Sequence, residues 1–157
     1  ICEIAEVNRS TFYHHYQSPQ ELYDDIINDL SVAFNDILEK NKAKGASQTV
    51  TIAEMLAYAE SRRELFLVIL GDNGNIGIGE KLTKIMETFM GTDSGSEMSM
   101  YCAQFISAGV AQLLWLWLNN KNRLSPEKLA LLLTAILSHG VKRAIASAGK
   151  LNEAENL

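Results

Sequence analysis

The stretch VNRSTFYHHY at residues 7–16, followed by QSPQEL at residues 17–22, decides how the chain folds. Asn8 is a good helix N-cap, because its side-chain oxygen accepts a hydrogen bond from a backbone N–H two or three residues further on. Phe12 and Tyr16 lie four residues apart and therefore share one helix face, which packs inward. The outward side chains are polar or aromatic and include no carboxylate: Arg9, Ser10, Thr11, Tyr13, His14 and His15.

The residues before this helix have the pattern of a second helical segment. Ile1, Ile4 and Ala5 show the spacing of an inward helix face, and a turn near Glu6 and Val7 separates them from the polar helix. Guanidinium, hydroxyl and imidazole groups suit phosphates and base edges. A helix, a short turn and such a polar helix are typical of a helix-turn-helix that reads DNA.

Residues 4–16 (IAEVNRSTFYHHY) and 18–22 (SPQEL) resemble the DNA-binding signature of the TetR family of transcriptional regulators. Two positions depart from the family pattern: Glu6 stands where a turn glycine is usual, and Pro19 replaces the usual lysine. The resemblance implies an all-α, TetR-like fold, with a partial helix-turn-helix at 1–18 and a helical effector-binding and dimerisation domain at 19–157. It also implies that the family's first helix and the start of its second precede this stretch.

The resemblance assigns the outward side chains of the polar helix to a double-stranded DNA operator. Those expected to face base edges in the major groove are Arg9, Ser10 and His14. Those expected to hold phosphates are Thr11, Tyr13 and His15. The adjacent histidines do not favour a metal site, because neighbouring residues on a helix point about 100° apart.

Composition agrees with a helical protein. The 157 residues are 47% hydrophobic and include only 2 prolines and 10 glycines, which favours helices around a sizeable core. The net charge of −5 argues against strong nonspecific affinity for DNA, but not against sequence-specific binding. Cys2 and Cys102 are typical of free thiols in a reducing cytoplasm. The apolar run at 105–118, about 14 residues with polar interruptions, is shorter than a membrane span, so we expect a cytoplasmic protein.

A long helix is predicted next. Ser18 can cap it, Pro19 suits its first position, and Glu21 completes a capping box. Lysines near its end and Gly45 are stop signals. A helix over 19–44 is about 39 Å long, and the resemblance implies that it is the connector that relays ligand binding to the DNA-reading segment.

The remaining residues predict a helical body. We expect a polar linker at 46–49, a helix capped by Thr51, a short apolar helix at 64–70, a loop at 71–79 and a helix at 82–90. The glycine-rich loop lacks the lysine of a P-loop and the ligand spacing of an EF-hand, so we interpret it as a plain loop beside the pocket.

Two further helices, over 97–119 and 126–148, complete the chain. The first is apolar on nearly every face and must be covered on every face, which favours a homodimer through this pair of helices. Residues 105–109, 117–118 and 124–127 also resemble one TetR subgroup, which includes proteins similar to the dihydroxyacetone-kinase operon activators.

Methionine and aromatic side chains suit an adaptable pocket for a small apolar effector, although an ordinary core uses the same residue types. The predicted pocket residues are Phe66, Met86, Phe89, Met90, Tyr101, Phe105 and Trp115. His139 is expected to be a core or interface residue. We recognise no catalytic set, metal motif or cofactor motif, and we expect a ligand-responsive repressor rather than an enzyme. Glu6 and the weakly basic character of the DNA-reading segment motivate the alternative, a co-regulator that acts through a protein partner.

Overall fold

The structure is a computed structural model that describes residues 8–71, 83–84 and 97–140. Every regular element in these ranges is a helix, which confirms the predicted all-α fold class. The elements are α1 (Arg9–His15), α2 (Pro19–Ala43), α3 (Gln48–Ser61), α4 (Arg63–Leu70), α6 (Glu97–Asn119) and α7 (Pro126–His139).

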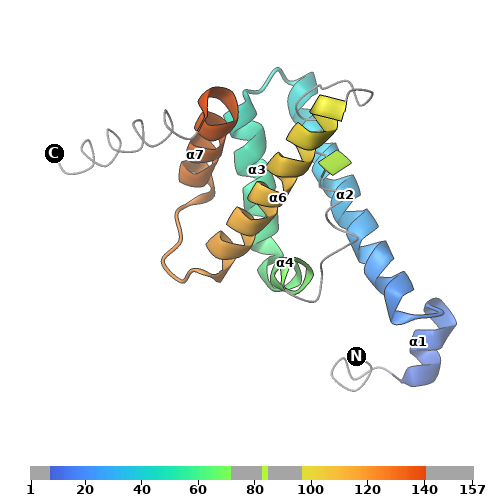
Figure 1. Ribbon diagram of the computed structural model, residues 1–157. Helices are drawn as coiled ribbons and strands as arrows, with labels where there is room; N and C mark the ends of the chain where they lie inside the picture. Colours follow the sequence, from blue (N-terminus) through green and yellow to red (C-terminus); the bar gives the residue numbers. More distant parts are fainter. Residues whose placement is uncertain (1–7, 72–82, 85–96, 141–157) are drawn as a thin grey trace.

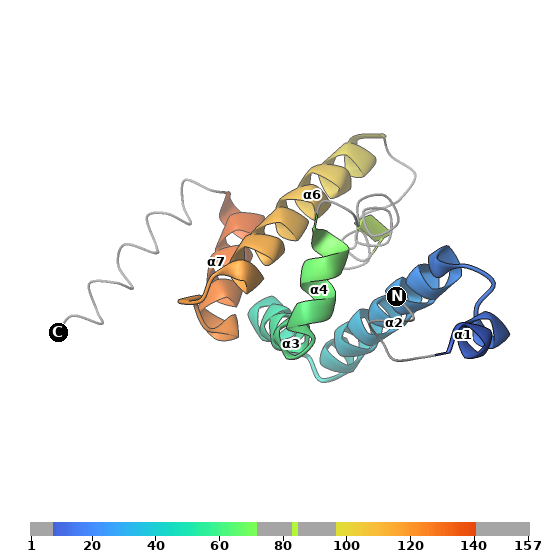
Figure 2. The same ribbon diagram turned by 90° about the horizontal axis from the view of Figure 1, so that it is seen from below.

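Four of the described helices form a body, and α2, with α1 at its N-terminal end, projects from this body as an arm. We call α3, α4, α6 and α7 the body and residues 8–16 the head. In the body α3 packs against α7 and α4 packs against α6, and α2 meets the body mainly through α3. Figure 1 shows α2 running away from the body with α1 at its far end, and Figure 2 shows α3 between α7 and α2. The predicted connector is therefore present as a helix, with bounds within one residue of the expected 19–44.

Three aromatic side chains join three helices in the core. Phe34 of α2 lies 5.7 Å from Tyr58 of α3 and 5.9 Å from Phe66 of α4, between ring centroids. Tyr58 and Phe66 meet edge to face at 6.5 Å. Rings at these distances gain both buried area and favourable edge-to-face electrostatics. This aromatic cluster fixes where the arm leaves the body.

The start of α3 differs from its prediction. The expected linker at 46–49 and the cap at Thr51 are wrong, because α3 already begins at Gln48. Its N-cap is Ser47, whose Oγ accepts from the backbone N–H of Val50 at 3.3 Å. The Thr51 hydroxyl instead donates to the carbonyl of Ser47 at 3.3 Å. Either hydroxyl residue can cap, and the earlier one does so.

The end of α7 also differs from its prediction. A single helix over 126–148 is wrong, because Gly140 has a φ of 81° and ends α7 at His139. A positive φ suits glycine and stops a helix. His139 is exposed at this end rather than in the core. The predicted start is confirmed, since Ser125 caps the helix and Pro126 follows it. Residues 141–148, and most of 71–96, lie outside the described residues.

One helix of the described chain, Met100–Asn119 within α6, is long and apolar enough to cross a membrane by length and composition alone. The length argument from 105–118 is therefore wrong, because the helix continues on the N-terminal side of Phe105. Its most apolar window is only 28% buried. One side of the helix lies in the core through Leu114, Trp117 and Leu118. Among the described residues, the other side of the helix carries exposed hydrophobic side chains, with Phe105 the most exposed.

The aromatic cluster predicts a large stability difference between neighbours in α4. Phe66→Ala should lower the free energy of unfolding by about 3–5 kcal/mol, because the side chain is 1% exposed and leaves a cavity. Val68→Ala, at a side chain that is 71% exposed, should change it by less than about 0.5 kcal/mol. Urea unfolding followed by circular dichroism measures both, and equal effects would contradict the assignment of the core.

Candidate nucleic-acid interface

Local hydrogen bonds form the head. The Asn8 Oδ1 accepts from the backbone N–H of Ser10 at 3.0 Å and from its hydroxyl at 3.1 Å, so the predicted N-cap is confirmed. On the inner side, the ring of Phe12 lies 5.8 Å from that of Tyr16, and both residues are partly buried. The sequence thus predicts both the start and the inner face of α1.

The outer face of α1 is open to solvent. All the predicted DNA-facing side chains are exposed: Arg9, Ser10, Thr11, Tyr13, His14 and His15. The helix RSTFYHH contains no acidic residue. Ser10 is shared between this face and the cap, since its hydroxyl donates to Asn8. These side chains offer donors for phosphate and base atoms, and they lie around most of the helix because successive residues point about 100° apart.

A three-residue turn connects α1 to α2. Ser18 caps α2, and its Oγ accepts from the backbone N–H of Glu21 at 3.2 Å, as predicted. The Glu21 carboxylate accepts from the backbone N–H of Gln17, one residue before the position that a capping box uses. This reciprocal pair holds the turn in one geometry.

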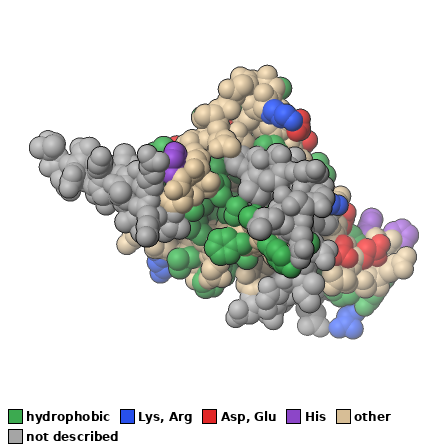
Figure 3. Space-filling model, turned by 45° about the horizontal axis from the view of Figure 1, so that its top comes forward, with side chains coloured by type: hydrophobic (Ala, Val, Ile, Leu, Met, Phe, Trp, Pro, Cys, Tyr) green, Lys and Arg blue, Asp and Glu red, His purple; other side chains and the backbone are tan. Residues whose placement is uncertain are grey.

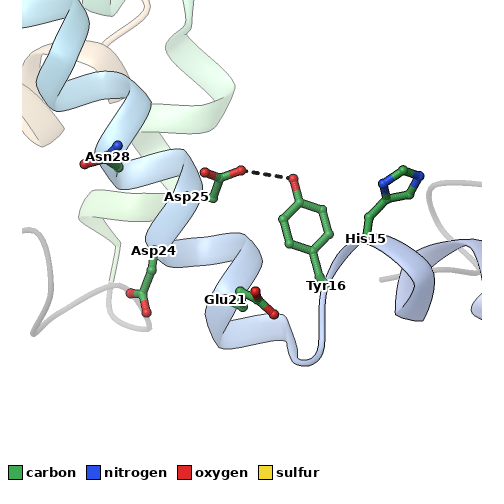
Figure 4. A pocket seen from close by; sticks show the side chains of 6 residues that line it. All are labelled: His15, Tyr16, Glu21, Asp24, Asp25 and Asn28. Carbon is green, nitrogen blue, oxygen red and sulfur yellow. Dashed lines mark hydrogen bonds between the residues drawn. The ribbon is translucent and has the colours of Figure 1, made fainter.

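An open cavity of about 510 Å³ lies between the head and the first turns of α2. Three of its six lining residues are acidic, and the lining consists of His15, Tyr16, Glu21, Asp24, Asp25 and Asn28. Figure 4 shows Tyr16 reaching from the end of α1 across to α2. Sequence analysis missed this cavity. The spacing of Glu21, Asp25 and Asn28 on one helix face was the available signal, but nothing local shows that the turn folds Tyr16 onto it.

The hydroxyl of Tyr16 donates to the Oδ2 of Asp25 at 3.1 Å. This hydrogen bond, together with desolvation and the negative charges of Asp25, Asp29 and Glu21, raises the pKa of the Tyr16 phenol above its ordinary value of 10.0. The phenol therefore stays protonated, and remains a donor, throughout the physiological pH range.

The other end of α2 is tied to α3. The Glu54 carboxylate accepts from the Nδ2 of Asn41 at 2.9 Å and from the Nζ of Lys40 at 3.3 Å. Asn41 is only 2% exposed, so it would be costly to bury without this partner. These two donors, Asn41 first, lower the pKa of Glu54 below 4.5.

The predicted pocket residues fall in different surroundings. Phe66 is part of the core, Trp115 is partly buried, and Tyr101 and Phe105 are 60% and 82% exposed. The described members of the set thus lie partly inside the core and partly on the open side of α6. The others, Met86, Phe89 and Met90, lie outside the described residues.

The described residues contain no group of three or more His, Cys, Asp or Glu side chains placed to hold a metal ion. The Cys102 thiol is free and exposed. Neither observation points to a metal site or a disulfide among the described residues.

A family model for the C-terminal region of TetR-type transcriptional regulators matches residues 48–139. The chain belongs to the TetR family of transcriptional regulators. The matched range starts with α3 and ends at the last residue of α7, so it is the body that carries the match. Regulators of this family bind DNA and are generally not enzymes. No curated protein and no solved structure matches the chain.

The tie between α2 and α3 predicts a pH-dependent stability. Because the folded pKa of Glu54 is lowered, its contribution is fully present above the ordinary value of 4.5 and is lost as the pH falls through the folded value. The stability gap between the wild-type chain and Glu54→Gln should therefore shrink between about pH 6 and pH 3.

Urea unfolding across that range measures the gap. Glu39→Gln is the matched control, because Glu39 pairs with Lys42 at 3.9 Å on the open surface of α2, where ion pairs contribute little. A gap for Glu54→Gln that does not change with pH would refute the assignment.

Proposed function

We propose that this TetR-family regulator is a ligand-responsive repressor that binds a palindromic operator as a homodimer in the cytoplasm. The observation that carries the proposal is the exposed face of α1, which has no carboxylate and lies at the N-terminal end of a 25-residue helix whose other end is held on the body. In this proposal residues 1–18 belong to the DNA-binding domain, and residues 19–157 form the effector-binding and dimerisation domain. The subgroup resemblance to dihydroxyacetone-kinase operon activators remains a prediction.

In the proposed complex α1 is the recognition helix. Arg9 and His14 would bind base edges, with Ser10 contributing while it remains part of the cap. Thr11, Tyr13 and His15 would bind phosphates and set the register of the helix on the duplex. One such helix reads a half-site only, so the proposal requires two heads.

An open stripe on α6 supports the homodimer. Tyr101, Phe105 and Leu116 are 60%, 82% and 61% exposed, and the spacing of four and eleven residues places them on one helix face with Ala108 and Gln112. Figure 3 shows hydrophobic side chains gathered near the middle of that face of the molecule. Exposed apolar stripes of this kind mark interaction sites, and a second copy of α6 offers the same apolar surface.

The proposed effector is a small apolar molecule bound in the body near the predicted methionine and aromatic residues. An effector that binds one tilt of α2 better than another shifts the population of that tilt. The spacing of the two heads, and with it the operator affinity, would change accordingly.

The recognition role of α1 predicts a specific loss of DNA binding. Arg9→Ala should weaken operator binding by about tenfold to a hundredfold, because a guanidinium contact to a base is lost. Lys42→Ala removes the same charge at the opposite end of α2 and should leave affinity near wild type. Gel-shift titration against the region upstream of the protein's own coding sequence measures both variants. A folded wild-type dimer that gives no gel shift at low salt would contradict the proposed DNA binding.

The stripe on α6 predicts the oligomeric state. Phe105→Glu should convert the dimer to a folded monomer, because a carboxylate in an apolar interface has no partner and the side chain contributes little to the core. Val32→Glu, at a half-exposed position of α2, is the matched control and should stay dimeric. Light scattering at micromolar concentration gives the mass, and a wild-type monomer would exclude the dimer.

A co-regulator that acts through a protein partner is the second candidate. The acidic lining beside α1 favours it, because Glu21, Asp24 and Asp25 repel phosphates from that side of the head. A pull-down that recovers a second TetR-like protein, together with no DNA affinity of the purified chain, would favour the co-regulator over the repressor.

A further inference from the structure

We propose that Tyr16 is a positioning residue, which fixes the direction of the recognition helix relative to the connector through its hydrogen bond to Asp25. The inference rests on the proposed DNA-binding function, since direction matters only if α1 reads DNA. It adds a specific pair of side chains to that function, and we call this pair the latch.

Tyr16 contacts both elements that the latch joins. Its ring lies 5.8 Å from that of Phe12 on the inner side of α1. Its hydroxyl donates to the Oδ2 of Asp25, nine residues further along the chain, at 3.1 Å. Figure 4 shows the ring spanning the gap between the end of α1 and the second turn of α2. One side chain therefore couples the inner face of the recognition helix to a fixed point on the connector.

Core packing does not fix this direction within the described residues. Helix α1 contains no buried residue, whereas α2 buries Ile27, Leu30 and Phe34 against the body. Among the described residues, hydrogen bonds at and beside the three-residue turn are the contacts that set the direction of this short helix. Hydrogen bonds are directional and can therefore hold α1 in one orientation. The bond between Glu21 and Gln17 acts on the turn, and the latch acts on the helix.

The charges at the latch keep it closed near neutral pH. The phenol is a donor only while protonated, and the surrounding carboxylates raise its pKa. Asp25 is the acceptor, and Asp24 beside it accepts instead from the Nε2 of Gln20 at 3.0 Å. Two adjacent carboxylates on one helix thus have different partners, which gives the experiment a matched control.

The expected effect is a loss of preorganisation. A recognition helix whose direction is less well fixed loses more freedom when it binds, so removing the latch weakens operator affinity without removing any DNA contact. The net value of one such hydrogen bond corresponds to between about threefold and tenfold in affinity. The same factor should appear as faster amide exchange in α1 of the free protein.

The test is a double-mutant cycle on the full chain with Tyr16→Phe, Asp25→Ala and the double variant, and with Asp24→Ala as control. Tyr16→Phe keeps the ring on Phe12 and removes only the hydroxyl. Operator affinity is measured by gel shift, and exchange of the α1 amides by mass spectrometry. We expect Tyr16→Phe to lose affinity relative to the wild-type protein. Asp25→Ala and the double variant should lose the same factor relative to Asp24→Ala, which removes one carboxylate beside the head without touching the latch.

The outcomes separate the latch from the proposed function. Additive effects of the two single variants, or a Tyr16→Phe variant equal to wild type while wild type binds its operator, would overturn the latch and leave the function standing. A second outcome is that the wild-type protein binds no DNA, while amide exchange in α1 rises equally in Tyr16→Phe and Asp25→Ala and does not rise in Asp24→Ala. In that case the latch stands and the DNA-binding proposal fails.

Discussion

The contact of Phe34 with Tyr58 and Phe66 is the interaction on which the arrangement of head and body depends. Phe34 lies near the middle of α2 and is 7% exposed, and the two rings that it contacts come from different helices of the body. Both contacts are made by one side chain of α2, so they fix that point of the helix better than they fix its tilt. The tilt must come from contacts elsewhere along the helix.

Polar contacts at the C-terminal end of α2 contribute to its tilt on the body, whereas those of its N-terminal part join it to the head. Asn41 and Lys40 tie the C-terminal end to Glu54 of the body, and Asp25 ties the N-terminal part to Tyr16 of the head. Phe34 is 15 residues from Pro19, about 22 Å along a helix, so a tilt of about 5° around it moves the head by about 2 Å. A small change in the body is thus enlarged at the head, provided that the head follows α2.

Local signals account for most of what the sequence predicted correctly. The caps at Asn8, Ser18 and Ser125 depend on residues within four positions of each other, and the bounds of α2 followed from such signals to within one residue. The cap of α3 failed because Ser47 and Thr51 carry the same chemistry, and the sequence pattern does not rank them. The end of α7 failed because the apolar spacing continues beyond Gly140, while its backbone does not.

Contacts between distant residues were beyond sequence reasoning. The Nε of Arg63 donates to the carbonyl of Leu118 at 2.8 Å, and Arg123 pairs with Glu60 at 2.7 Å, which fastens the end of α6 to α3 and α4. No spacing in the chain links residues 55 or 63 positions apart. The Tyr16–Asp25 bond is closer in sequence, but it depends on how the turn at 16–18 folds, so the candidate site could be predicted only on its outer face.

Helix α6 shows why an apolar sequence alone does not separate a core from an interface. Its residues are apolar around most of the circumference, and mean hydropathy is the same whichever side is covered. The structure divides them: Ala103 and Leu118 are fully buried, while Phe105 is 82% exposed. An aromatic ring in water costs free energy without stabilising the single chain, so the exposed ring marks this side of α6 as a candidate interaction surface. In the proposed homodimer a second α6 would cover it with the same rows of side chains, and that symmetry would bring two heads to one operator.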